Sequence, residues 1–155
     1  MTMFGFPKGA AIAAFAVGIA TAAYAQDVQT KQYDDGGIYE GTFVDGKQDG
    51  IGTYRLPNGY EYTGQWVAGE IRGQGIARFP NGSIYEGAFV AGKPEGQGKI
   101  TFADGGTFEG DWVDGNITGQ GVARYANGVV YEGEFRNAMH NGIGIMTSPG
   151  GYVYD

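Results

Sequence analysis

One pattern of 23 residues is repeated five times in this chain, and this repetition constrains the fold more than any other feature. The copies begin at Tyr39, Tyr62, Tyr85, Phe108 and Tyr131. Each copy opens on a phrase such as YEGTF, continues through a turn to Gly-x-Gly, and ends on a second turn closed by glycine. A strict period of this length indicates stacked supersecondary units that each contact mainly their neighbours. Such an array favours a binding or scaffolding surface over a catalytic centre.

The first five positions of each copy alternate, which predicts a strand with one buried face. In the first copy that face carries Tyr39, Gly41 and Phe43. A turn such as Asp45-Gly46 follows, and this dipeptide between alternating segments predicts a tight β-hairpin. The fifth copy has Asn137-Ala138 there, and because alanine resists a positive φ we expect that hairpin to be distorted or looser.

A second strand is predicted to start at Gly-x-Gly, as at Gly50 and Gly52. Glycine in a strand costs about 0.5–1 kcal/mol relative to alanine. Bare backbone on the buried face leaves room for an aromatic ring to lie against it, and burying a ring contributes about 1.5–3 kcal/mol. The predicted fold is therefore all-β, an elongated single-layer solenoid of tandem β-hairpins with a ladder of rings packed over glycine.

The array is expected to occupy residues 33–155, after a short linker at 26–32. A partial copy at 33–38 would cover the N-terminal edge, and a sixth copy starts at 154. The full copies span 39–61, 62–84, 85–107, 108–130 and 131–153. Because an open sheet edge invites pairing with another chain, the C-terminal edge is either a self-association surface or an interruption of a longer array. Whether Asp155 is the natural end is left open.

Residues 1–25 lie outside the repeats and contain an apolar, alanine-rich segment from Ala10 to Tyr24 that ends in an A-x-A pattern. At about 15 residues, the segment is shorter than the roughly 20 that a spanning helix needs. This favours a cleaved signal-peptide helix over a retained membrane anchor. We expect cleavage near Ala25-Gln26 and a periplasmic or extracellular protein. Because the chain has no Cys, its stability outside the cell has to come from packing.

The formal net charge is −7, and removal of Lys8 with the signal peptide would make it −8. Nucleic acids and anionic membrane surfaces select for basic patches. The acidity therefore argues against both, while neutral or cationic partners remain open.

These residues resemble MORN repeats, the membrane occupation and recognition nexus family. The shared pattern is Tyr-Glu-Gly-x-Phe/Trp, then Gly-Lys, Gly-x-Gly and Asp/Asn-Gly, and Lys47 and Lys93 supply the Gly-Lys pair. The other copies depart from that pair, at Glu70, Asn116 and Met139. The resemblance implies an elongated β-hairpin solenoid with roles in scaffolding, self-association into dimers and phospholipid contact. It implies no catalytic residue.

Few residues offer catalytic or metal-binding chemistry, and we expect no catalytic site, cofactor or metal. His140 is the only His, and we interpret it as an exposed turn residue. With no Cys, ordinary zinc sites lack ligands. Neither Ser83 nor Ser148 lies in the context of a nucleophile turn.

Charged residues recur on the face opposite the rings. Acidic residues occupy the second position of four copies and Arg the seventeenth position of three, at Glu40, Glu86, Glu109, Glu132, Arg55, Arg78 and Arg124. One interpretation is a solvated face of cross-strand charge pairs, each contributing a few tenths of a kcal/mol. The other is a strip that docks a polar polymer or a partner protein.

We expect the ten aromatic residues at the first and fifth positions of the copies to form the core. A second interpretation is a binding site, because a single-layer array cannot bury both faces. Ring edges along a concave groove would suit sugar rings, proline-rich peptides or extended strands. The candidate groove residues are Tyr62, Trp66, Tyr85, Phe89, Phe108 and Trp112. We expect a non-enzymatic protein-interaction or scaffolding module, with a protein partner or a second copy of itself. The alternative is a peripheral envelope binder of phospholipid or glycan. Nucleic acid is not expected.

Overall fold

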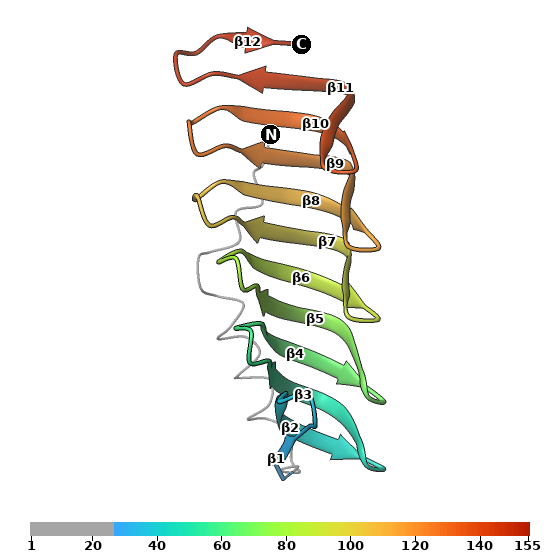
Figure 1. Cartoon of the computed structure of the whole chain (residues 1–155). Coiled ribbons are helices and arrows are strands. Elements are labelled where there is room, and N and C mark those ends of the chain that lie inside the picture. Colours follow the sequence, from blue (N-terminus) through green and yellow to red (C-terminus); the bar gives the residue numbers. More distant parts are fainter. Residues whose placement is uncertain (1–26) are drawn as a thin grey trace.

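The computed structural model describes residues 27–155, in which twelve strands form one open antiparallel sheet in sequence order (Figure 1). The all-β array of tandem hairpins is therefore confirmed, while the predicted signal-peptide helix lies outside the described residues. The strands are β1 Gln29–Gln32, β2 Ile38–Val44, β3 Lys47–Arg55, β4 Glu61–Val67, β5 Glu70–Arg78, β6 Ile84–Val90, β7 Lys93–Thr101, β8 Thr107–Val113, β9 Asn116–Arg124, β10 Val130–Arg136, β11 Met139–Thr147 and β12 Val153–Tyr154. Within 27–155, no helix has the length and apolar character needed to cross a membrane.

The hairpin turns have the two-residue form that the sequence predicts. Asp45 and Gly46 have φ values of 50° and 76°, and two consecutive positive values characterise a type I′ turn. Because this turn keeps the flanking strands paired, Val44 lies directly opposite Lys47. The second strand thus begins at Lys47, three residues earlier than the Gly-x-Gly start that we predicted.

The fifth hairpin keeps the same turn, so the expected distortion at Asn137-Ala138 is wrong. Ala138 adopts a φ of 62°, and Arg136 pairs with Met139 as in the other copies. The Ala138 N–H also donates to the carbonyl of Ile117 in the preceding copy at 2.9 Å. These backbone hydrogen bonds hold alanine in a conformation that it disfavours.

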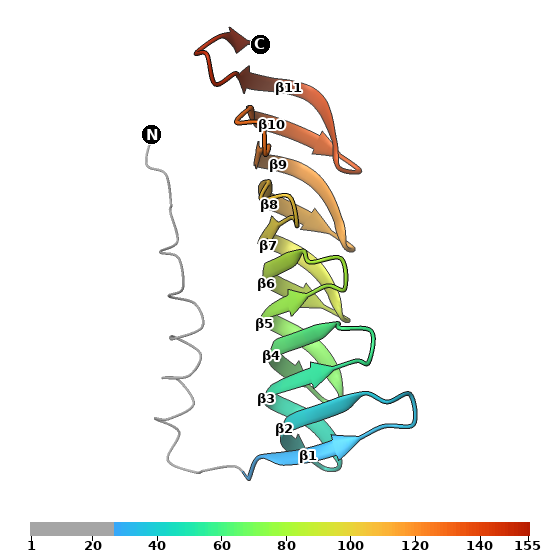
Figure 2. The ribbon, with the colours of Figure 1, turned by 60° about the vertical axis from the view of Figure 1, so that its left-hand side comes forward.

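Each hairpin bends within its second strand. In the second copy Gly64 pairs with Gly75, but the next pair is Trp66 with Ile71. One residue on β4 therefore faces three on β5, and the extra length is absorbed around Gly73, whose φ is 100°. Repetition of this irregularity bends the sheet into a trough, and Figure 2 shows the second strands curving away from the rest of the sheet.

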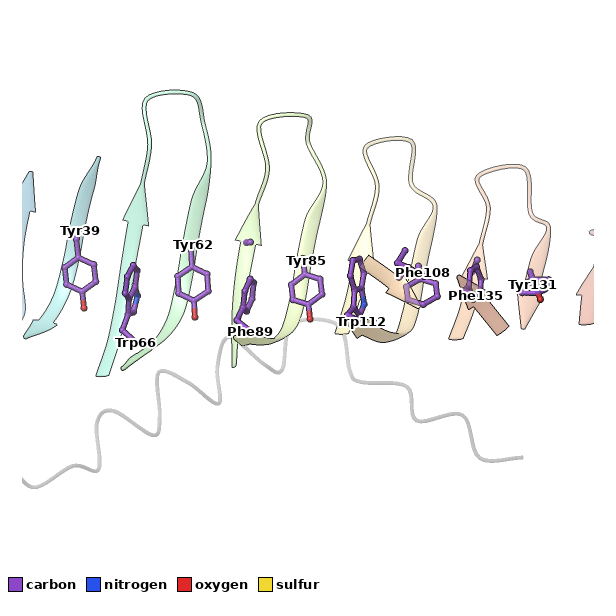
Figure 3. Close-up of a cluster of buried hydrophobic side chains, with 12 residues drawn as sticks. Tyr39, Tyr62, Trp66, Tyr85, Phe89, Phe108, Trp112, Tyr131 and Phe135 are labelled. Carbon is purple, nitrogen blue, oxygen red and sulfur yellow. The ribbon is translucent and has the colours of Figure 1, made fainter. Parts of the chain in front are cut away.

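The core is a single file of aromatic rings along the trough (Figure 3). Neighbouring rings meet edge to face, with centroids 5.7 Å apart for Tyr62 and Trp66 and 5.0 Å apart for Tyr62 and Phe89. This is a preferred geometry for aromatic pairs. The Tyr62 ring also covers the Gly64–Gly75 pair, where a Cβ on Gly75 would lie 2.5 Å from ring atoms. The predicted packing of rings over glycine is confirmed.

The first edge of the sheet is covered differently from the prediction. Gln29–Gln32, which we assigned to the linker, form β1 and pair with Ile38–Gly41 of β2. The turn between them belongs to the predicted partial copy. At the other end of the described sheet, Val153 and Tyr154 pair with Thr147 and Met146.

Candidate interaction surface

The six predicted groove residues lie in the core. Tyr62 and Tyr85 have no exposed surface, and the exposed fractions of the other four are between 1% and 6%. The predicted exposure of ring edges at Tyr62, Trp66, Tyr85, Phe89, Phe108 and Trp112 is therefore wrong for this structure, because neighbouring rings cover one another. Their use by a partner stays a prediction.

Polar atoms of the core rings are satisfied internally. The Tyr62 hydroxyl donates to the carbonyl of Gln65 at 2.9 Å, and Trp66 Nε1 donates to the carbonyl of Gly52 at 3.2 Å. Burial, followed by the charges of Tyr33 and Asp49, raises the pKa of the Tyr39 hydroxyl to about 12. Burial also raises the pKa of Tyr62 and Tyr85. These rings stabilise the scaffold and offer little to a ligand.

A second row of side chains lies directly after strands β1, β3, β5, β7 and β9, and we call it the outer row. Its members are Tyr33, Leu56, Phe79, Phe102 and Tyr125. Phe79 is half-buried and packs on Tyr60, with ring centroids 5.8 Å apart. Phe102 and Tyr125 are 39% and 43% exposed. Large aromatic surface is thus accessible on the outer row, and mainly in its C-terminal half.

A cavity of about 220 Å³ opens between Phe102 and Tyr125. Its walls extend from the outer row across the trough to the hairpin tips, at Ile117 and Ala138, and Asp104 lies among its polar residues. The full lining consists of Phe102, Asp104, Gly106, Thr107, Phe108, Ile117, Ala123, Arg124, Tyr125, Ala126, Phe135 and Ala138. It is a partly enclosed hollow with mainly apolar walls.

Two small residues explain why the cavity lies at this place. Gly106 occupies the position of Tyr60 in the first copy, and Ala123 occupies the position of Ile100 one copy earlier. At those earlier positions Tyr60 and Ile100 pack against the core. We did not predict this site, although Gly106 and Ala123 lie beside the same boundary between copies in the sequence.

The face opposite the rings carries charge pairs. Arg55 Nε lies 2.8 Å from Glu61, and Arg55 Nη1 lies 3.7 Å from Glu40. All three side chains are substantially exposed, so each pair contributes at most about 1 kcal/mol. This arrangement fits the interpretation of a solvated face around Arg55.

Farther along the same face, the carboxylates form a shallow open depression. It is lined by Glu109, Asp111 and Glu132 together with Gln97 and Gln120. Gln97 donates to Asp111, and the Gln120 N–H donates to the same carboxylate at 2.8 Å. Asp111 is therefore engaged within the sheet. Among residues 27–155, no group of three or more His, Cys, Asp or Glu is placed to hold a metal ion.

His140 lies in strand β11, opposite Phe135, and not in the turn where we placed it. It is exposed, as predicted. Its ring stacks on Tyr131 with centroids 3.7 Å apart, and its Nε2 lies 2.7 Å from the Tyr125 hydroxyl. His140 therefore extends the ring ladder and positions one wall of the cavity.

The family model described as MORN repeat matches residues 39–59, 62–84, 85–107, 108–130 and 131–151, which is most of the chain. The chain belongs to the MORN repeat family. Alsin of Rattus norvegicus is 43% identical over an alignment of 49 residues, and the match covers 28% of this chain and 3% of Alsin. This MORN chain therefore matches only a small part of that relative.

A solved structure with a similar fold is the TCP domain of SAS-4 (dCPAP) of Drosophila melanogaster, in complex with a proline-rich motif of Ana2 (dSTIL). The TM-score is 0.52 with 19% identity, and the match covers 82% of this chain and 69% of that chain. At this identity the likeness shows the fold alone. Membership of the MORN family indicates a repeat-based module for protein or membrane-lipid interaction.

Proposed function

We propose that this MORN array is a non-enzymatic scaffold that holds an extended segment of a partner protein in its trough. The observation that carries the proposal is the cavity between Phe102 and Tyr125, the place where apolar surface is both enclosed and reachable. A pocket with a few polar groups among apolar walls is the usual form of a binding site.

Recurring and variable positions of the repeat have different roles, and this difference supports the cavity as the binding site. Residues that recur in every copy, such as the rings and paired glycines around Tyr62, pack against one another and leave little surface for a partner. Residues that differ between copies line the cavity, for example Gly106 and Ala123. Recognition by the variable positions of a constant framework is a general property of repeat proteins.

Two further observations favour a protein segment. The net charge of −7 disfavours anionic lipid surfaces. The SAS-4 domain of similar fold was solved with a motif of another protein. We further propose that the chain works after export to the cell envelope, supported by the apolar segment and the A-x-A pattern before Gln26. A phospholipid or glycan is the alternative occupant, because the half-exposed rings of Phe102 and Tyr125 also suit sugar rings or acyl chains.

Affinity capture from the native envelope, followed by mass spectrometry, tests the proposal. The wild-type chain is compared with Phe102→Ser/Tyr125→Ser, which alters the trough. The matched control is Val67→Ser/Val113→Ser, because these valines are 49% and 50% exposed outside the cavity. We expect a protein that is recovered by the wild type and the control and lost with the trough variant.

Retention on phosphatidylethanolamine and phosphatidylglycerol vesicles, or on peptidoglycan, without recovery of a protein would support the alternative. Loss of the captured protein with the control and not with the trough variant would contradict the proposed surface.

A further inference from the structure

We infer that the trough recognises a proline-rich segment in the polyproline II conformation, which runs along the outer row and seats one apolar side chain between Phe102 and Tyr125. The inference rests on the proposed function and names the class of its partner segment.

The spacing of the repeats matches the period of a polyproline II helix. Each copy adds two strands, and antiparallel strands lie about 4.7–4.9 Å apart, so equivalent side chains recur about every 9.5 Å. A polyproline II helix has three residues per turn and a rise of 3.1 Å, so equivalent side chains recur about every 9.3 Å. A segment with proline at every third residue therefore stays in register with the outer row.

Other extended or helical segments do not match this period. A β-strand repeats a face every two residues, or about 6.7 Å. An α-helix advances about 5.4 Å per turn, and two turns give about 10.8 Å. Either would drift out of register between Phe79 and Tyr125, which are two repeats apart in the array. About six residues of polyproline II span that distance of about 19 Å.

The volume and the lining of the cavity also favour a segment of a polymer. Its volume of about 220 Å³ is below the roughly 300–1,000 Å³ of small-molecule sites, but it can hold a side chain of a polymer. Four of its lining residues are rings: Phe102 and Tyr125 are partly exposed, and Phe108 and Phe135 are core rings behind them. Aromatic-lined grooves are the established receptors for polyproline II ligands, whose preformed conformation reduces the entropy lost on binding.

The charge of the chain favours a basic partner segment. Asp104 lies at the cavity and is exposed, and the chain as a whole has a net charge of −7. Asp34 and Asp35 stand in the equivalent turn at the N-terminal end of the outer row. Arg124 also lines the cavity, so the preference for a segment with Lys or Arg beside its prolines rests on exposed Asp104 and on the acidity of the chain as a whole.

The test uses three ten-residue fluorescent peptides and the purified chain. The first has proline at every third position and one terminal Arg. In the second, alanine replaces the prolines, and in the third, Glu replaces the Arg. By fluorescence anisotropy we expect the first peptide to bind at least tenfold more tightly than the second, and more tightly than the third. Equal binding of the first two peptides would overturn the inference.

Substitutions in the cavity test where the first peptide binds. Ala123→Ile fills the cavity with the residue found one copy earlier, and Tyr125→Ala removes one wall. Each should weaken binding of the first peptide at least tenfold. The control variants Tyr125→Phe and Val113→Ala, the second of which lies outside the cavity, should bind the peptide as the wild type does. Circular dichroism verifies folding of each variant, and Phe102→Ala replaces either one that does not fold. Unchanged binding by folded cavity variants would contradict the inference.

The two proposals fail in distinguishable ways. If the capture experiment yields a trough-dependent protein without a proline-rich segment, and the peptide does not bind, this inference is wrong and the scaffold function stands. If neither a protein nor the peptide binds in the trough, both are wrong.

Discussion

At the scale of single residues, the hydroxyl groups of the opening tyrosines fasten the rings to the backbone. In four copies this hydroxyl donates to the carbonyl three residues later, at distances of 2.8–3.1 Å. The fourth copy opens with Phe108, which has no hydroxyl group. The framework therefore contains an internal comparison for the strength of this hydrogen bond.

Tyr62→Phe should lower the free energy of unfolding by about 1 kcal/mol, because the Gln65 carbonyl loses its donor. Phe108→Tyr should raise the free energy of unfolding by up to about 1 kcal/mol by supplying the missing donor. Urea denaturation of both variants measures these changes. Opposite signs are the expected result, and a stabilising Tyr62→Phe would contradict this account.

Ala138→Gly should stabilise the protein by about 1 kcal/mol, because glycine adopts the φ of 62° at this position without the strain of a Cβ. Ala126→Gly is the matched control, since Ala126 is exposed near a turn and has no positive φ. The control should be neutral or destabilising. If thermal unfolding ranks the two substitutions in the reverse order, the turn is not strained as described.

Particular residues show what could be predicted from the sequence. The glycine pairs were predictable because a residue without a side chain, repeated opposite a ring, has one obvious packing role, as at Gly64 and Gly75. The alternation also placed Trp66 and Trp112 on the buried face, but the complete covering of their ring edges was not predictable, because it depends on rings from adjacent copies. The polar segment Gln29–Gln32 pairs because β2 offers it an open edge, and its own sequence carries no strand pattern.

At the scale of elements, the hairpin tips of the second to fifth copies are each tied to the preceding copy. The N–H of the second turn residue donates to a carbonyl one copy earlier, as from Gly69 to Gln48 at 2.7 Å. A side chain adds a second tie in some copies: Asp49 accepts from the N–H of Ala68 at 3.0 Å. In the next copy the equivalent of Asp49 is Arg72, which instead contacts Glu70 at 3.0 Å.

Asp49→Ala should lower the free energy of unfolding by about 1 kcal/mol, because the Ala68 N–H loses its acceptor. Arg72→Asp should recreate the tie at Ala91 and offset the loss of the exposed pair with Glu70, which contributes at most about 1 kcal/mol. Denaturant unfolding of both variants and the double variant tests this pairing. Stabilisation by Asp49→Ala would contradict it.

At the scale of the whole molecule, we expect the buried tyrosines to make the fold sensitive to alkaline pH. Burial raises the pKa of Tyr39 from an ordinary value near 10 to about 12, and raises those of Tyr62 and Tyr85 as well. A raised pKa in the folded state means that stability is fully present below pH 10 and is lost as the pH rises through the folded-state value.

We therefore expect a cooperative loss of β-sheet circular dichroism above about pH 10, together with the appearance of tyrosinate absorbance. The Tyr39→Phe variant has one fewer buried hydroxyl to ionise, and its stability should decline less steeply over this range. Complete ionisation of all tyrosines with an intact sheet would show that the rings are not buried as described.

The whole array also explains why function is expected where the copies differ. The recurring residues build a rigid trough, and the small residues Gly106 and Ala123 open it at one place. The MORN framework is thus shared by every copy, while the recognition surface that we propose lies at the boundary between the third and fourth copies. Both the framework and the cavity keep the backbone pattern of the repeat.

Site-specific photo-crosslinking in the native envelope tests this claim most directly. Benzoylphenylalanine is placed either at Phe102 in the trough or at Glu86 on the opposite face, both of which are exposed. We predict a discrete protein adduct from Phe102 and none from Glu86. An adduct from Glu86 with none from Phe102 would contradict it.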